Sequence, residues 1–270
     1  MRRAYIDIPL PQAQIHCRYS GSTGPWIFLF HQFPLSCRQF ERLIPFLGNF
    51  SRVYGLDTPG YGVSPAPTAS LSIEEYAKTL VAAIDSMGAR EFAILGIETG
   101  TAIAAEVARQ ASNERVIATI FIDPPPVEQD RQRDFVADLG NPDLEQKGDH
   151  LITEWQRFQN HWGPDVDNAQ LRMAVSETFY VYGRFDWGIK AFSNYDLTTV
   201  LSEISCPTLL VTVAESIFHK NLDAVSSLIK DVECLITPNR RPALTWTAPQ
   251  DVAEMIRNLL SRLGKLDPPP

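Results

Sequence analysis

The most constraining feature of this chain is a turn in which one acidic residue stands between two glycines. Residues 92–100 read Phe-Ala-Ile-Leu-Gly-Ile-Glu-Thr-Gly, and a run of small residues continues to position 108. The apolar run predicts a buried strand, and the segment that follows predicts a helix. Glycine at positions 96 and 100 permits a turn too tight for side chains beside the residue that projects from it, which is Glu98. The chain therefore presents one carboxylate at a sharp junction between a strand and a helix.

The composition indicates a globular protein and argues against several kinds of partner. The 270 residues are 44% hydrophobic, which is enough for a sizeable core in one domain with an insertion. The net charge of −8 comes from scattered acidic residues, which disfavours nucleic acid and anionic membranes as partners. No segment has the ~18 consecutive apolar residues of a membrane span, and the N-terminus has no apolar stretch long enough for export. We expect a cytoplasmic protein that acts on or binds a small molecule, with its oligomeric state left open.

The cysteines predict buried free thiols rather than a metal or redox centre. They show no C-x-x-C spacing and no metal-like pairing with histidine. The segment 96–100 also lacks the glycine spacing of a dinucleotide-binding loop. We therefore expect neither a metal nor a cofactor. The four cysteines are Cys17, Cys37, Cys206 and Cys234.

Strands and helices are predicted to alternate along the chain, with one interruption. Ser72 begins an S-x-x-E capping box for a helix, and residues 249–263 form an amphipathic closing helix. The alternation predicts a mostly parallel, doubly wound α/β sheet with a helical lid. Residues 1–126 and 196–270 would form the core, and residues 127–195 the lid. Buried strands are expected at 26–30, 52–56, 92–95, 116–122, 207–213 and 233–236.

Three further motifs accompany the Glu98 turn, namely His31-Gln-Phe-Pro34, Asp57-Thr-Pro-Gly-Tyr-Gly-Val-Ser64, and Tyr195-Asp-Leu197 before a late strand. In this order and spacing, the four motifs resemble the α/β-hydrolase superfamily, in particular its esterase, lyase and dehalogenase branch. The Glu98 turn is similar to the nucleophile elbow of that family, residues 31–34 are similar to its H-G-x-P oxyanion loop, and residues 57–64 to its D-x-P-G-x-G-x-S loop. The resemblance covers nearly the whole chain and implies an α/β-hydrolase fold.

The chain departs from this family at the residues that carry its chemistry. The family presents Ser, Asp or Cys at the elbow, partnered by an acid and a histidine after two late strands. Here Glu98 stands at the elbow, the acid position falls near Ser216, and the histidine position falls at Pro242 in a span without histidine. Because proline has no acid-base group, the sequence excludes a Ser-His-Asp relay.

Three interpretations of Glu98 remain. As a general base or acid, it would transfer a proton in lyase, cyclase, isomerase or decarboxylase chemistry, which we favour. As a nucleophile, it would form an ester that turns over slowly without a histidine to activate water. As a structural or ligand-anchoring group, it would accept hydrogen bonds from the following helix and the oxyanion loop, in a protein that binds a small molecule or a partner protein without catalysis. Burial raises the pKa of a carboxyl group, and hydrogen-bond donors lower it. The sequence does not show which effect is larger at Glu98, so it does not decide between the three roles.

The other candidate site residues lie on loops expected at the carboxyl ends of the strands, where α/β active sites usually form. His31 is a catalytic candidate or a brace for the oxyanion loop. The Gln32 amide and backbone groups near Phe33 would polarise a substrate oxygen. Asp123 ends its strand at a position where some branches of the family place their acid. Further candidates for substrate contacts are Ile97, Thr99, Tyr180, Arg184, Trp187, His219 and Trp246.

The predicted lid is rich in aromatic side chains. Such residues suit a flat, largely apolar ligand, although most of them can equally pack the lid onto the sheet. We therefore favour a hydrophobic, aromatic or polyketide-like carbonyl compound as the substrate. The lid residues concerned are Trp155, Phe158, His161, Trp162, Phe179, Tyr180, Tyr182, Phe185, Trp187, Phe192 and Tyr195.

Overall fold

A computed structural model of the protein describes residues 1–10, 13–112, 114–139, 147–181, 183–238 and 240–266. Within them the strands form one eight-stranded sheet in the order β1-β2-β4-β3-β5-β6-β7-β8. β2 pairs antiparallel with β1 and β4, and the remaining pairs are parallel. This confirms the mostly parallel α/β sheet. The strands are β1 (Arg2–Asp7), β2 (Gln14–Ser20), β3 (Trp26–Phe30), β4 (Arg52–Leu56), β5 (Phe92–Ile97), β6 (Val116–Ile122), β7 (Thr208–Val213) and β8 (Val232–Thr237).

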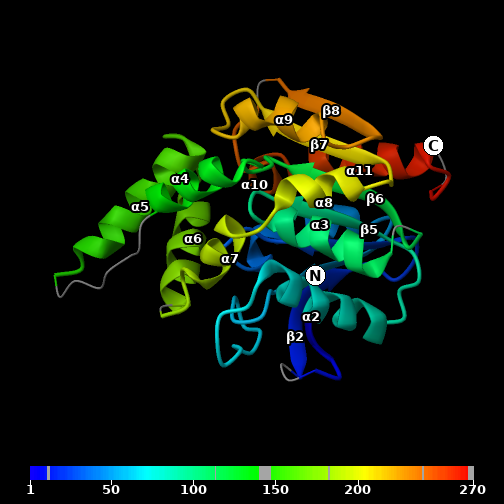
Figure 1. The fold of residues 1–270 in the computed structure, drawn as a ribbon, viewed down its shortest axis with the longest axis horizontal. Coiled ribbons are helices and arrows are strands. Elements are labelled where there is room, and N and C mark those ends of the chain that lie inside the picture. Colours follow the sequence, from blue (N-terminus) through cyan, green and yellow to red (C-terminus); the bar gives the residue numbers. More distant parts are fainter. Residues whose placement is uncertain (11–12, 113, 140–146, 182, 239, 267–270) are drawn as a thin grey trace.

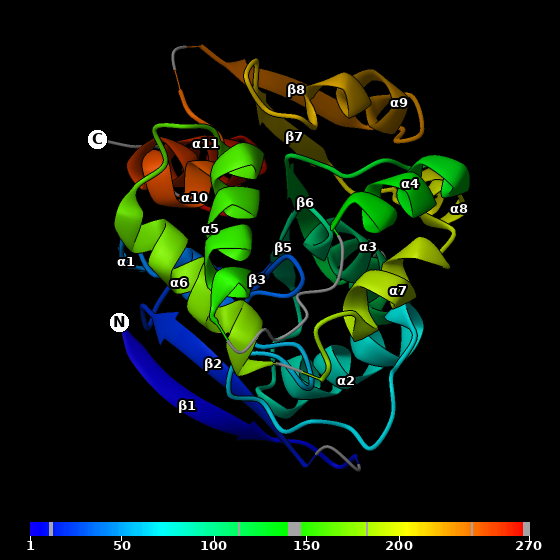
Figure 2. The same cartoon turned by 90° about the vertical axis from the view of Figure 1, so that its left-hand side faces the viewer.

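Helices cover both faces of the sheet. Figure 2 shows α2 and α3 on one face and α1, α10 and α11 on the other. Each face has its own apolar core, built from alternate side chains of the strands. The predicted capping box is present, since the Ser72 and Glu75 side chains each accept from the other's backbone N–H. These helices and turns are η1 (Cys37–Phe40), α1 (Ile44–Leu47), α2 (Ile73–Ser86), α3 (Gly100–Ala111), α8 (Leu197–Glu203), η2 (His219–Asn221), α9 (Leu222–Ser226), α10 (Leu244–Thr247) and α11 (Pro249–Arg262).

Four further helices lie between β6 and α8, where the lid is predicted. They are α4 (Gln129–Leu139), α5 (Asp149–Trp162), α6 (Asn168–Tyr180) and α7 (Trp187–Ser193), and they extend to the left in Figure 1. Helices α5 and α6 share a small core of their own, which also includes Leu35 from the loop after β3 and Trp246 from α10. The division of the chain at residues 127 and 195 stays a prediction. Among the described residues, each helix is too short or too polar to cross a bilayer.

Candidate active site at the Glu98 turn

The sharp turn predicted at Glu98 is present and requires its two glycines. Glu98 follows the last residue of β5 and takes a backbone φ of +49°, in the left-handed region that residues with a Cβ seldom adopt. A Cβ atom on Gly96 would lie 2.6 Å from the carbonyl oxygen of Gly100, and one on Gly100 would clash with the carbonyl oxygen of Phe30. The strained residue between them therefore projects its carboxylate at the carboxyl edge of the sheet.

The Glu98 carboxylate is buried and held by three side chains. Only 3% of the residue is exposed. Its Oε2 accepts from the Gln32 amide at 2.7 Å and lies 2.8 Å from Nε2 of His161. Its Oε1 accepts from the indole N–H of Trp162 at 3.4 Å. Within the described part of the chain, these donors are side chains rather than the backbone N–H groups expected for a purely structural carboxylate.

His161 was predicted only as one of the aromatic residues of the lid, and not as a partner of Glu98. It lies in the last turn of α5, and Phe218 from the loop after β7 packs edge-on against its ring at a centroid distance of 5.5 Å. The sequence argument considered the loop that contains Pro242, so it found no imidazole for the elbow. The structure brings one from the lid instead, and Glu98 therefore has a histidine partner that does not come from the family's usual position.

The oxyanion loop is hydrogen-bonded to the protein itself. The backbone N–H of Gln32 donates to Oε1 of Gln39 at 3.1 Å, and the Gln39 amide donates back to the Gln32 side-chain oxygen. This reciprocal pair turns the remaining Gln32 amide donor toward Glu98. The backbone N–H of Phe33 donates to Oγ1 of Thr99 at 2.8 Å. A substrate oxygen bound to Phe33 would therefore have to displace the Thr99 hydroxyl.

His31 braces this loop. Its Nε2 accepts from the backbone N–H of Thr58 at 3.0 Å, and its Nδ1 therefore carries the proton that it donates to the carbonyl oxygen of Gln32 at 2.9 Å. Burial lowers the pKa of the imidazole, although the charge of Asp57 opposes this. With both nitrogens engaged by the backbone, a neutral His31 is not available for proton transfer. These contacts favour the bracing role of His31, and its catalytic role stays a prediction.

A second buried carboxylate, Asp123, ends β6 beside the elbow. The hydroxyl of Thr212 donates to its Oδ1 at 2.7 Å, and the hydroxyl of Ser216 bonds to the same carboxylate. Burial raises the pKa of Asp123 to about 6, with a further increase from the Glu98 charge and against the hydrogen bond from Thr212. Ser216, near which the sequence resemblance places the acid of the family, thus helps to hold a buried carboxylate that follows the neighbouring strand.

Several predicted substrate contacts lie elsewhere in the fold. Ile97 belongs to the core on the α11 side of the sheet. Tyr180 is 62% exposed at the end of α6, and Nε of Arg184 donates to the carbonyl oxygen of Gly60. Trp246 packs into the core of α5 and α6. The described contacts of these four residues do not reach the Glu98 carboxylate, so their predicted roles receive no support.

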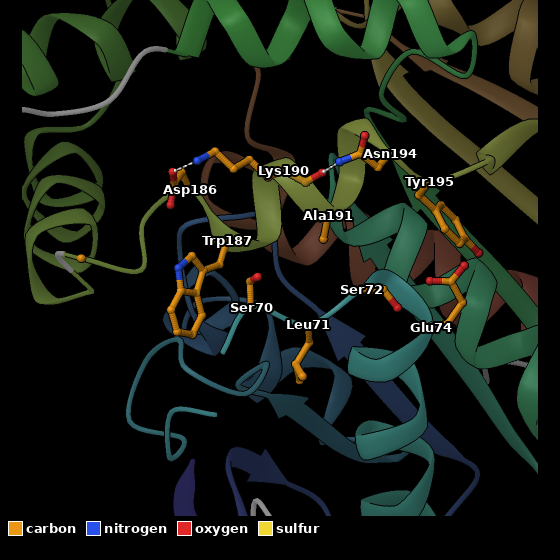
Figure 3. Close-up of a pocket in the computed structure, with 11 residues that line it drawn as sticks. Ser70, Leu71, Ser72, Glu74, Asp186, Trp187, Lys190, Ala191, Asn194 and Tyr195 are labelled. Atoms are coloured by element: carbon orange, nitrogen blue, oxygen red, sulfur yellow. Dashed lines mark hydrogen bonds and ion pairs between the residues drawn. The ribbon is translucent and has the colours of Figure 1, made fainter. Parts of the chain in front are cut away.

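The described contacts of Trp187 and His219 also do not include the Glu98 carboxylate. His219 lies in the short turn η2, and its Nδ1 has no hydrogen-bond partner among the described residues. Trp187 lines a cavity of about 580 Å³ between α7 and the start of α2 (Figure 3). The Lys190 ammonium of this cavity is paired with Asp186. The cavity therefore has no unpaired charge at Lys190 with which to recognise a ligand.

The aromatic residues of the lid mainly serve packing. Tyr182 lies outside the described residues. His161 and Trp162 contact Glu98 directly. Five of the aromatic residues are buried in the apolar cores, namely Phe158, Trp162, Phe185, Phe192 and Tyr195.

Comparisons with known proteins agree with this architecture. The family model described as the alpha/beta hydrolase fold matches residues 25–141, which include the oxyanion loop and the elbow. A haloalkane dehalogenase of Mesorhizobium japonicum is 26% identical over 117 residues. That match covers 43% of this chain and 38% of the dehalogenase, so the aligned part is well under half of that relative.

Solved structures match over nearly the whole chain. A putative lipase from Acinetobacter baumannii has a TM-score of 0.80 at 16% identity and covers 97% of this chain and 92% of its own. An epoxide hydrolase without ligand has a TM-score of 0.78 at 15% identity, and the match covers 97% of this chain and 100% of the hydrolase. A bromoperoxidase from Bacillus anthracis has a TM-score of 0.77 at 20% identity, and the match covers 96% of this chain and 100% of the bromoperoxidase. At these identities the likeness concerns the fold.

The sheet, the elbow and these matches together define a protein with the α/β-hydrolase fold. At its elbow, Glu98 meets a histidine from helix α5.

Proposed function

We propose that this protein is an enzyme that transfers protons through Glu98 and His161 instead of using a serine triad. The observation that carries the proposal is the 2.8 Å contact between Oε2 of Glu98 and Nε2 of His161. The two side chains are 4% and 9% exposed, and their interaction is stronger there than it would be in water. A carboxylate and an imidazole are the groups most often used for general acid–base catalysis.

In the proposed reaction Glu98 removes a proton from the carbon next to a substrate carbonyl. The electron pair of the broken C–H bond forms an enolate, whose oxygen accepts a hydrogen bond from the Gln32 amide. In an isomerisation, the proton then returns from Glu98 or His161 to another carbon. In a cyclisation, the enolate carbon instead attacks a second carbonyl carbon of the substrate, and the alkoxide that results takes the proton from Glu98 or His161. In a lyase or decarboxylase reaction, cleavage of a C–C bond supplies the enolate electrons, and the same groups deliver a proton to the carbon.

We propose a hydrophobic, aromatic or polyketide-like carbonyl compound as the small-molecule substrate. Support comes from the rings that surround the pair. Trp162 and Phe218 both pack edge-on against the His161 imidazole. Apolar walls around a few polar groups are typical of small-molecule sites.

A second candidate function is hydrolysis through an ester on Glu98. The position of His161 favours it, because an imidazole beside the elbow carboxylate can activate water for hydrolysis of the ester. The names of two relatives, a haloalkane dehalogenase and an epoxide hydrolase, suggest haloalkanes and epoxides as substrates to try.

A third candidate is a binding protein without catalysis. The contact between Phe33 N–H and the Thr99 hydroxyl favours it, because that contact occupies a donor which would otherwise polarise a substrate oxygen. Glu98 would then anchor a ligand by its charge alone.

One experiment separates the three. Wild type, Glu98→Gln and the control Glu106→Gln are incubated in ¹⁸O-labelled water with carbonyl compounds, haloalkanes and epoxides. Mass spectrometry then follows the small molecules and the peptide that contains Glu98. Glu106 is a matched control because it is a buried glutamate on the neighbouring helix α3, paired with Arg109.

Proton transfer predicts conversion of a carbonyl compound by wild type and Glu106→Gln, loss of conversion in Glu98→Gln, and no label in Glu98. Label in the Glu98 carboxylate after turnover would establish the ester route and overturn the proposal, because water then attacks the ester carbonyl. Ligand retention by wild type without conversion of any compound would favour the binding protein.

A further inference from the structure

A second buried group of reactive side chains lies apart from the Glu98 carboxylate. It contains His16 on β2, Cys37 at the start of η1 and Asp57 directly after β4. All three residues are buried, and one ligand atom from each lies within 4.8 Å of the others. Imidazole, thiolate and carboxylate are the side chains that bind zinc in proteins.

The separations of these atoms suit a tetrahedral ion. Nδ1 of His16 lies 2.7 Å from Oδ2 of Asp57 and 3.9 Å from Sγ of Cys37. Metal–ligand bonds of about 2.0–2.3 Å place the ligand atoms of a tetrahedral zinc site roughly 3.3–3.6 Å apart. One observed separation is shorter than this range and the other is longer. Shifts of less than about 1 Å would therefore bring the three atoms around one ion.

The same three residue types also occur in catalytic cysteine triads, but the arrangement here is different. In a triad, the histidine contacts the nucleophile and the acid through opposite ring nitrogens. Here Cys37 and Asp57 both approach Nδ1 of His16. Burial also raises the pKa of the Cys37 thiol well above its usual value, whereas a nucleophilic cysteine needs a lowered pKa.

The carboxylate of the group is firmly oriented. The backbone N–H of Cys37 donates to Oδ1 of Asp57 at 2.7 Å, and that of Val63 donates to Oδ2 at 3.0 Å. Although burial opposes it, the hydrogen bond from His16 helps to hold the pKa of Asp57 below its usual value. Asp57 is therefore an ionised ligand whose outer hydrogen bonds are already in place, as at metal sites in general.

A cleft of about 380 Å³ leads from the surface to this group, and both His16 and Asp57 line it. The cleft supplies an entry path and room for a water molecule as a fourth ligand. Glu177 also lines it, and its side chain is only 8% exposed. Its Oε2 is buried without a hydrogen-bond partner among the described residues. An unsatisfied acceptor in the same cleft suits a group that would bond to a metal-bound water.

The positive charges of the cleft do not exclude a cation. Arg18 pairs with Glu41 at 2.9 Å, and Arg38 pairs with Glu177 at the same distance. Arg3 lines the cleft as an exposed side chain in solvent. The charges of Arg18 and Arg38 are thus already balanced by Glu41 and Glu177, and a divalent ion would neutralise one carboxylate and one thiolate.

We propose that His16, Cys37 and Asp57 form a binding site for one divalent ion of the zinc type, with water from the cleft as the fourth ligand. The thiol proton and any proton on Nδ1 leave to solvent as the metal bonds form, so binding strengthens as the pH rises. The ion would join β2, η1 and the end of β4. Thr58 follows Asp57 and donates to His31, so a bound ion would also stabilise the oxyanion loop.

The test is a titration of the metal-free full-length protein with Co²⁺, because cobalt bound to a thiolate gives an intense charge-transfer absorption. We expect one Co²⁺ per chain with this absorption, and its loss when Zn²⁺ is added. Cys37→Ser and His16→Asn should lose the absorption and bind Zn²⁺ at least about tenfold more weakly. Cys17→Ser is the matched control, a buried cysteine on the same strand as His16, and should bind as wild type does.

Two results would overturn the proposal. The absorption could persist in Cys37→Ser and disappear in Cys234→Ser, which would assign it to an exposed thiol. Alternatively, Zn²⁺ could bind to wild type without releasing a proton at pH 7, which would exclude coordination by the protonated thiol. The second measurement uses wild type alone, so it holds even if a substituted chain fails to fold. The site is independent of the reaction proposed for Glu98.

Discussion

Two buried carboxylate–histidine pairs of nearly equal length lie in this molecule. Asp57 and His16 are 2.7 Å apart, and Glu98 and His161 are 2.8 Å apart. The pairs differ in the source of the remaining donors. Backbone N–H groups complete the Asp57 pair, whereas side chains complete the Glu98 pair. Backbone donors cannot turn away from the carboxylate, but side chains can.

The location of the two pairs reinforces this difference. Asp57 and His16 both come from the sheet and its loops, so their geometry is set by the core. Glu98 comes from the sheet and His161 from lid helix α5. The second pair therefore depends on how α5 packs against the rest of the fold. The Asp57 pair suits structure or a bound ion, and we propose that the Glu98 pair acts on a substrate.

The largest expected effect concerns the role of the lid histidine. His161→Gln should lower turnover by roughly 100- to 10,000-fold, the usual contribution of a general acid–base group. The measurement is kcat on the substrate found by the mass-spectrometric screen. His150→Gln, a histidine on the same helix, is the control and should retain turnover. Equal kcat values for His161→Gln and wild type would show that His161 does not transfer a proton in the reaction.

The next effect concerns stability. Asp57→Ala should lower the free energy of unfolding by about 3–5 kcal/mol, because it leaves buried donors without an acceptor. Glu98→Gln should change it by less than about 1 kcal/mol, because the amide fills the same space without a buried charge. Urea unfolding of both variants tests this order. A larger loss of unfolding free energy in Glu98→Gln than in Asp57→Ala would mean that Glu98, and not Asp57, is the structural carboxylate.

The third effect is a pH dependence at Asp123. Its folded-state pKa of about 6 lies above the ordinary value of 3.8, so folding favours the protonated form by roughly 3 kcal/mol. This stability is present below pH 3.8 and is lost as the pH rises through 6. From pH 4 to pH 8, wild type should therefore lose about 2 kcal/mol of unfolding free energy relative to Asp123→Asn, because a small part of the effect is already lost at pH 4. If the difference in unfolding free energy between Asp123→Asn and wild type were the same at both pH values, folding would not raise the pKa of Asp123.

The smallest effect concerns the weakest donor to Glu98. Trp162→Phe keeps an aromatic ring and removes the indole N–H, which lies at the long distance of 3.4 Å. We expect a loss of about 0.5 kcal/mol in the free energy of unfolding, together with a small fall in turnover. Thermal unfolding and kcat measure the two. A loss above about 2 kcal/mol would mean that the three donors act as one tightly coupled unit.

The sequence predicted much of the sheet because buried strands have a local signature. The runs at 26–30, 52–56 and 116–122 match β3, β4 and β6. It did not predict β1, most of whose residues are exposed, so the strand lacks a continuous apolar run. The order of motifs was sufficient for the fold, which the family match then confirmed.

The sequence predicted the Glu98 turn but not its contact with His161, and the reason is sequence distance. Glu98, Asp123 and the oxyanion loop all directly follow parallel strands, so their meeting at one edge follows from the sheet. His161 belongs to a lid helix whose position depends on packing against Leu35 and α10. The hydrophobic periodicity of the sequence does not predict such a long-range contact.

By itself the sequence predicted the fold, the turn at Glu98 and a span around Pro242 without histidine, because each depends on residues close together in the chain. The tertiary structure alone decided which histidine meets which carboxylate. Glu98 receives its imidazole from the lid, and Asp57 receives His16 and Cys37 from two other segments. Such pairings depend on the long-range packing of the core and lid, which brings side chains together regardless of their separation in sequence.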